Sequence, residues 1–171
     1  LNRFSSDGYD LNDDDNLSTV DPYSNYTLNT KVTYDFTENT KLFVSGRFYT
    51  QNQDFVASEE LQGESDVNEW NGHLQVDHKF NDKWSSYFEF YATNYKADEF
   101  LDDTDGERFS DSFFNQTMIR PEFRTTFNLN EKSSFIGGLG LTHESLKRSK
   151  SCTYLRVFFQ ATWFLERRSQ P

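Results

Sequence analysis

The densest group of side chains that could bind an ion lies between residues 98 and 107, where six acids crowd one polar segment. Asp103, Asp105 and Gly106 have the spacing of part of a calcium loop, in which carboxylates two positions apart hold the ion. The same pattern requires an acid at position 101, which is Leu101 in this chain. We therefore expect a solvated acidic loop, with Asp103 and Asp105 as weak metal candidates and no established metal site.

Three histidines are the remaining candidates for metal binding or proton transfer. His73 and His78 differ in parity, so on a strand they would lie on opposite faces and would not chelate one ion. His143 precedes Glu144 and Ser145, residue types that occur together in hydrolases. Neighbours in a strand point apart, however, and the chain has no GxSxG nucleophile motif. We predict neither an enzyme nor a cofactor site.

The composition points to strands rather than helices as the elements that carry these residues. Aromatic residues make up 18% of the chain, although the hydrophobic share is only 35% and the mean hydropathy is −0.85. Phe, Tyr, Trp and Thr are enriched in strands. No run of 18 apolar residues occurs, so no transmembrane helix is predicted. The net charge of −11 argues against a nucleic-acid partner, whose phosphates call for clustered Lys and Arg.

A period of two repeats along most of the chain. Residues 26 to 36 read YTLNTKVTYDF, an alternation of apolar and polar residues that is long enough to cross a bilayer as a tilted strand. Similar segments form three hairpins, whose short turns follow Phe36, Phe80 and Phe127 at intervals of 44 and 47 residues. This regular interval indicates a repeated hairpin.

Longer polar segments separate the hairpins. We expect loops before Pro22, over residues 52 to 68 and over residues 96 to 112. Short turns at one end and long loops at the other are typical of outer-membrane barrels. Pro121 lacks a backbone donor and predicts a bulge or an edge position in its strand.

The alternation also predicts two faces. We expect one face to contact lipid, through Leu28, Val32, Tyr34, Leu74, Val76, Phe88, Phe90 and Phe123. We expect the other face to line a polar lumen, through Lys31, Asp35, Arg47, Glu89, Arg120, Glu122 and Arg124.

The predicted fold is all-β: an antiparallel up-and-down meander of six to seven long strands, part of a transmembrane β-barrel. Residues 1–23 would be an acidic extracellular loop segment, and residues 24–146 would be three repeated β-hairpins of the barrel. Residues 147–171 would be a divergent basic tail with room for one further strand. The net charge changes from −16 over residues 1–146 to +5 over the tail, so we hypothesise a truncated or shifted reading frame there.

The phrases YSNYTLNTKVTYDFTENTKLFVSGRFYTQNQDF (23–55) and FIGGLGLTHESLKR (135–148) resemble the barrel of TonB-dependent outer-membrane receptors, in the style of the Bacteroidetes branch. The resemblance implies active uptake of iron-siderophore complexes, cobalamin, haem or glycans across the bacterial outer membrane. It implies the lipid bilayer, the remainder of the barrel and a plug domain as partners. This sequence shows neither a plug nor a TonB box, so it would reach TonB only through missing parts and would not transport alone.

Two alternatives stay open at this stage. One is a small self-contained outer-membrane barrel with a structural or adhesive role. The other is a soluble β-sandwich that binds glycans through Tyr and Trp, because the inner faces of sandwiches also carry alternating aromatic residues. Residues 1–10 have no apolar stretch typical of a signal peptide, so we expect a mature chain or one cut from something larger.

Overall fold

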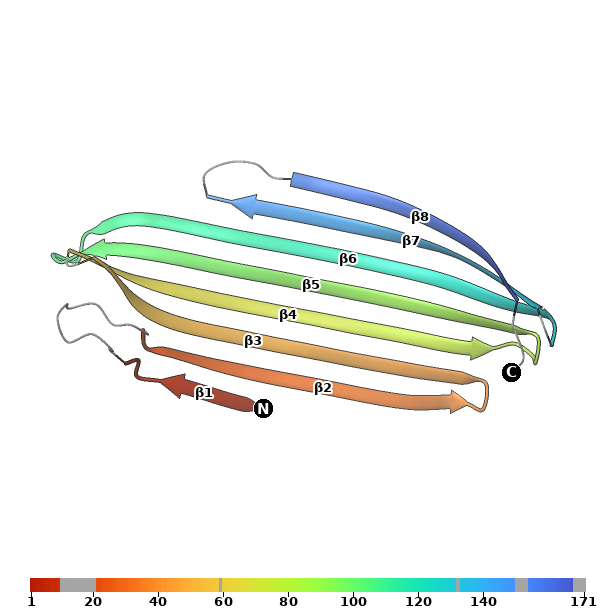
Figure 1. The fold of residues 1–171 in the computed structure, drawn as a ribbon. Helices are drawn as coiled ribbons and strands as arrows, with labels where there is room; N and C mark the ends of the chain where they lie inside the picture. Colours follow the sequence, from red (N-terminus) through yellow and green to blue (C-terminus); the bar gives the residue numbers. More distant parts are fainter. Residues whose placement is uncertain (10–20, 59, 132, 150–153, 168–171) are drawn as a thin grey trace.

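In the computed structural model, the described residues form one antiparallel sheet of eight strands that lie in the order of the sequence (Figure 1). The structure describes residues 1–9, 21–58, 60–131 and 133–149 with their side chains, and the backbone of residues 154–167. The strands are β1 (Asn2–Ser6), β2 (Tyr23–Thr37), β3 (Thr40–Ser58), β4 (Leu61–Lys79), β5 (Trp84–Asp103), β6 (Arg108–Asn130), β7 (Ser133–Arg148) and β8 (Tyr154–Arg167).

The predicted all-β, up-and-down fold is confirmed, with seven long strands, β2 to β8, and one short strand, β1. Each of β2 to β7 pairs with the strands before and after it in the chain, and β1 and β8 pair with β2 and β7, so the sheet contains no crossover. No helix within the described ranges is long and apolar enough to cross a membrane.

The short turns at one end of the sheet are stabilised by hydrogen bonds between backbone N–H groups and side chains of the same turn. In the β2–β3 turn the backbone N–H of Asn39 donates to Thr37 Oγ1 at 3.2 Å. In the β4–β5 turn Asn81 Oδ1 accepts from the backbone N–H groups of Lys83 at 2.9 Å and Trp84 at 3.0 Å. Asn and Thr favour turns because their side chains can replace a missing backbone partner in this way.

The opposite end of the sheet corrects the sequence prediction, because two segments expected as long loops are strand. The β3–β4 ladder continues to the pair Ser58–Leu61, and the β5–β6 ladder continues to Asp102–Arg108. Their polar residues pair across the ladder: Asn52 Nδ2 donates to Glu64 Oε1 at 2.7 Å. The prediction failed because a strand with two polar faces gives no apolar alternation to detect.

Two further differences concern β1 and Pro121. Residues 2–6 lie inside the segment predicted as a loop, yet they pair with Tyr23–Thr27 at the edge of the sheet. Pro121 lies in an interior strand, opposite Phe90. The β6–β7 pairing is interrupted there and resumes in the same register, so the missing N–H opens a gap in the ladder rather than a bulge.

The sheet has almost no core. Among the described side chains, Ala92 is the one buried apolar residue, and Val32 and Tyr34 are 52% and 57% exposed. The ribbon is a single gently curved layer, and no second layer of described residues covers either face (Figure 1). A soluble β-sandwich needs two packed sheets, so this arrangement does not support that alternative.

Candidate functional site

The strand register sorts the predicted site residues onto two faces of the sheet. All eight residues predicted to contact lipid share one face, which we call the apolar face. For example, the pairs Tyr34–Leu42, Leu42–Val76, Val76–Phe88 and Phe88–Phe123 form one continuous row across five strands. Whether this face contacts lipid stays a prediction, but the strand register places its members on one exposed or half-buried surface.

The seven charged residues predicted to face a lumen all share the opposite face, which we call the polar face. The pairs Asp35–Lys41, Lys41–Asp77, Asp77–Tyr87 and Tyr87–Arg124 form one row of it. The remaining members have the same parity in their strands: Lys31, Arg47, Glu89, Arg120 and Glu122.

The apolar side chains of this face form a band across the strands. At the end toward the long hairpins, the border of this band runs obliquely to the strands. On β2 the last apolar side chain toward the long hairpins is Tyr26, whereas on β6 the apolar band ends at Ile119, which is followed in that direction by the polar Thr117 and Asn115. The position on β2 that lies level with Ile119 is Thr30, because the ladder pairs connect the two through Ala92, Gly72 and Gly46. The limit therefore shifts by four residues over the four strand spacings from β2 to β6.

This shift corresponds to an inclination of the apolar band. One residue of rise, about 3.3 Å, per strand spacing of about 4.8 Å gives an angle of about 35° between the strands and the normal to the band. Beyond the limit this face is mostly polar, with three exposed or partly exposed apolar side chains that stand apart from the band: Val56, Phe100 and Phe113.

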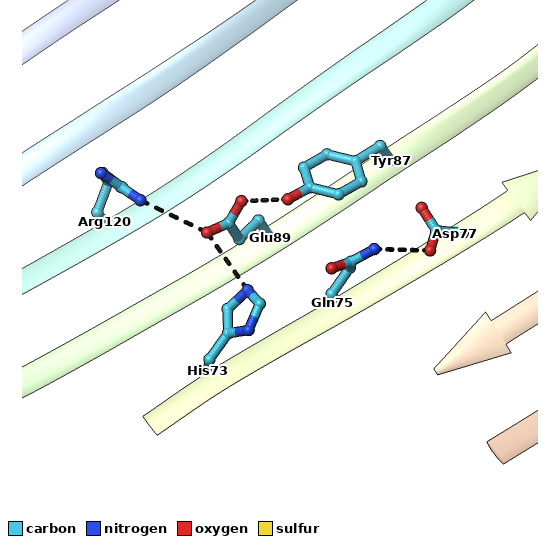
Figure 2. Close-up of polar contacts among 6 residues, drawn as sticks. All are labelled: His73, Gln75, Asp77, Tyr87, Glu89 and Arg120. Atoms are coloured by element: carbon cyan, nitrogen blue, oxygen red, sulfur yellow. Dashed lines mark hydrogen bonds and ion pairs between the residues drawn. The ribbon is translucent and has the colours of Figure 1, made fainter. Parts of the chain in front are cut away.

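Glu89 is the centre of a polar cluster on the polar face (Figure 2). It accepts a hydrogen bond from the Tyr87 hydroxyl, and Arg120 Nη2 lies 3.5 Å from Glu89 Oε1. His73 Nε2 lies 3.3 Å from the same oxygen, although its N–H is not aimed well enough to count as a hydrogen bond. The cluster joins three strands, because these residues belong to β4, β5 and β6.

Two arginines of β6 stack on tyrosines of β5. Arg124 lies over the ring of Tyr87, 4.7 Å from its centroid, and Arg120 lies over Tyr91 at 5.8 Å. Each pair is directly opposite in the ladder, so the flat guanidinium covers an aromatic face. The sequence analysis assigned no role to either tyrosine. The signal that could have identified them is their position two residues before and two residues after Glu89, which places both on its face of the strand.

Other charges of the polar face form exposed cross-strand pairs. Lys41 Nζ lies 3.5 Å from Asp35 Oδ1, and Arg47 Nη1 lies 3.5 Å from Glu69 Oε1. Exposed pairs of this kind contribute little to stability, but they neutralise the surface locally. An open concavity of about 1040 Å³ lies near the short turns, with Asp35, Lys41 and Arg124 among its lining residues.

The metal and hydrolase candidates are not brought together. Asp103 Oδ1 accepts from the backbone N–H groups of Asp105 at 3.0 Å and Glu107 at 2.8 Å, so this carboxylate holds the β5–β6 turn. His78 lies on the apolar face, with Nδ1 2.8 Å from Thr40 Oγ1, and His73 lies on the polar face. In the part of the chain that the structure describes, no three His, Cys, Asp or Glu residues could hold a metal ion together.

His143 and Glu144 occupy opposite faces of β7, as the strand periodicity predicts. Glu144 points to the polar face, where Gln116 Nε2 donates to its Oε1 at 2.6 Å. His143 is paired with Ile119, which belongs to the apolar face. Cys152 and the side chains of residues 154–171 lie outside the described residues.

Comparison with known proteins identifies the fold. No protein-family model and no curated protein matches the sequence. The crystal structure of BauA, the ferric preacinetobactin receptor from Acinetobacter baumannii, is similar over 84% of this chain with a TM-score of 0.55 and 11% identity. The ferric yersiniabactin uptake receptor FyuA from Yersinia pestis is also similar, over 84% of this chain, with a TM-score of 0.44 and 13% identity.

The chain spans 28% of the length of BauA and 24% of that of FyuA. Identity this low shows likeness of fold alone. The fold of this chain is similar to that of one sector of the barrel wall of BauA.

Proposed function

We propose that this chain is part of the barrel of a TonB-dependent receptor in the bacterial outer membrane. The complete receptor would take up an iron-siderophore complex, cobalamin, haem or a glycan. The apolar face would contact the acyl chains, and the polar face would line the lumen. The hairpin style of residues 23–55 extends the proposal to a receptor of the Bacteroidetes type.

The oblique apolar band is the observation that carries this proposal. Strands of outer-membrane barrels are tilted by about 35–45° from the bilayer normal, and the band inclination of about 35° falls at the edge of that range. A bilayer imposes one flat apolar slab on all strands, so tilted strands must shift their apolar residues from one strand to the next. The band from Tyr26 to Ile119 has this shift.

The unpaired edge of the sheet indicates which further parts of the receptor this chain would need. β1 pairs only with Tyr23–Thr27 of β2. Within the described ranges, the edge of β2 from Leu28 to Thr37 has no ladder partner on that side. Unpaired backbone groups are not tolerated in hydrocarbon. We infer that further strands of the receptor complete the barrel, that a plug occupies the lumen, and that TonB is contacted through that plug. The sheet alone would not transport.

The two-face assignment can be tested with a pair of adjacent cysteines. Cys152 is first replaced by Ser, and Val44→Cys and Ser45→Cys are then made separately; these neighbours on β3 belong to the apolar and polar faces. The variants are made in the complete receptor that contains this chain, because the sheet alone has an unpaired edge, and the receptor is inserted into lipid vesicles and treated with a membrane-impermeant maleimide. We expect Ser45→Cys to react, and Val44→Cys to react only after the bilayer is dissolved in detergent.

Equal labelling of both cysteines in intact vesicles would contradict the proposal. So would a chain that stays soluble without detergent and shows no heat-modifiable mobility in gels, because a barrel sector should behave as a membrane protein.

A further inference from the structure

The polar face changes its chemistry along the strands. Toward the short turns it carries the charged residues described above. Toward the long hairpins it carries amides and rings. We call this second region the amide–aromatic patch and define it as Tyr49, Gln51, Gln53, Tyr95, Phe114 and Gln116. These residues share one face of β3, β5 and β6 and begin where the apolar band ends.

On β3 the patch is a relay of hydrogen bonds. The Tyr49 hydroxyl donates to Gln51 Oε1, and Gln51 Nε2 donates to Gln53 Oε1 at 3.1 Å. The relay orients the three side chains in one line along the strand. It ends at the Gln53 amide nitrogen, which has no hydrogen-bond partner among the residues with described side chains.

On β5 and β6 the patch is a ring pair beside an amide. Tyr95 meets Phe114 edge to face, with ring centroids 5.9 Å apart. Gln116 is the ladder partner of Tyr95. An open cavity of about 610 Å³ adjoins the pair, and its lining includes Glu99, Ser112 and Phe114.

The charges around the patch are largely neutralised by near neighbours. Arg47 lies 3.5 Å from Glu69, and its guanidinium lies over the Tyr49 ring at 5.4 Å. Glu144 accepts a hydrogen bond from the neutral Gln116 amide and keeps its negative charge. Glu99 and Arg148, which carry opposite charges, both line the adjoining cavity. The surface therefore offers amide donors, amide acceptors and ring faces with little net charge.

We propose that the amide–aromatic patch binds a neutral oligosaccharide. The inference rests on the proposed function, which places this end of the polar face in water beyond the membrane. Sugar hydroxyls both donate and accept, as side-chain amides do, and the apolar C–H faces of a sugar ring pack on aromatic rings, which combine an apolar body with a polar edge. Tyr49 and Tyr95 are two strands apart, about 10 Å, so one sugar unit is too short to contact both.

The test measures binding of maltohexaose, cellohexaose and xylohexaose to the complete receptor that contains this chain, in lipid vesicles, by isothermal titration calorimetry. Ferric citrate and a sulfated oligosaccharide serve as charged probes. We expect at least one neutral hexasaccharide to bind. Tyr95→Ala and Gln51→Ala should each weaken that binding at least about tenfold, whereas Tyr26→Ala, on the apolar face, should leave it unchanged. Binding should also be insensitive to 0.5 M salt, because it does not depend on charge.

The inference fails if no neutral hexasaccharide binds to vesicles that pass the cysteine-labelling test; the proposed function would then stand. It also fails if only the charged probes bind, or if both patch variants bind as the unaltered chain does. Gln53→Ala provides a second check if Tyr95→Ala does not insert. If the cysteine-labelling test itself fails, the proposed function is contradicted instead.

Discussion

Glu89 accepts a hydrogen bond from the hydroxyl of Tyr87, two residues earlier on the same face of β5. The same carboxylate lies near Arg120 and His73 of the two flanking strands. One acid therefore lies close to polar side chains from three strands. This relationship makes Glu89 the polar-face residue whose replacement should have the largest effect.

Glu89→Gln should destabilise the folded chain by about 1–3 kcal/mol, because it removes the negative charge that balances Arg120 and weakens the bond to Tyr87. Urea unfolding in lipid vesicles, followed by tryptophan fluorescence, measures the change. Glu122→Gln is the matched control: the residue lies directly opposite Glu89 in the β5–β6 ladder, and its side chain makes no hydrogen bond or ion pair with the described residues. Equal losses in both variants would show that the cluster contributes nothing specific.

Val32→Arg should prevent or weaken membrane insertion, whereas Thr33→Arg should be tolerated. Val32 lies on the apolar face and its neighbour Thr33 on the polar face. An arginine that faces lipid costs about 2–4 kcal/mol at the bilayer midplane and less near the interfaces. The inserted fraction is measured by flotation of vesicles after refolding. Similar fractions for the two variants would contradict the assignment of faces.

Gly138→Ala should destabilise the sheet by about 1–3 kcal/mol. A Cβ at this position would lie 2.9 Å from the Phe123 carbonyl oxygen, and this is backbone that cannot rotate away. Gly72→Ala is the control, since a Cβ there meets nothing within 4 Å. Thermal unfolding of the two variants in one detergent compares them, and a Gly138→Ala variant as stable as Gly72→Ala would show that β6 and β7 are less closely packed than described.

Asp82 should titrate below the ordinary aspartate pKa of 3.8, because the side-chain hydrogen bond and the charge of Lys79 lower its pKa. Since the folded pKa is the lower one, the Lys79–Asp82 interaction is fully present above pH 3.8 and is lost as the pH falls through the folded pKa. The carboxyl carbon signal of Asp82, followed by NMR, gives the midpoint. Lys79→Gln should raise that midpoint to the ordinary value, and 1 M salt should raise it in part; an unchanged midpoint in Lys79→Gln would rule out Lys79 as the cause.

The sequence by itself determined the two faces of the sheet and its short turns. Side chains of a strand alternate strictly, so parity alone placed Leu28 and Phe123 on one face and Lys31 and Arg124 on the other, although they are about 90 residues apart. The turn after Phe80 was visible because Asn81 supplies its own side-chain acceptor. These features depend only on residues that are adjacent in the sequence, so a short stretch of sequence is enough to predict them.

Only the tertiary structure decided how far the strands continue and which residues meet across them. The extension of β3 and β4 to Ser58 and Leu61 depends on backbone bonds between strands, and polar side chains do not reveal such bonds. The stacking of Arg124 on Tyr87, 37 positions earlier, depends on the register of the β5–β6 ladder. Register is a relation between distant segments, fixed by the turn and by pairing along the whole ladder, so no short stretch of sequence contains it.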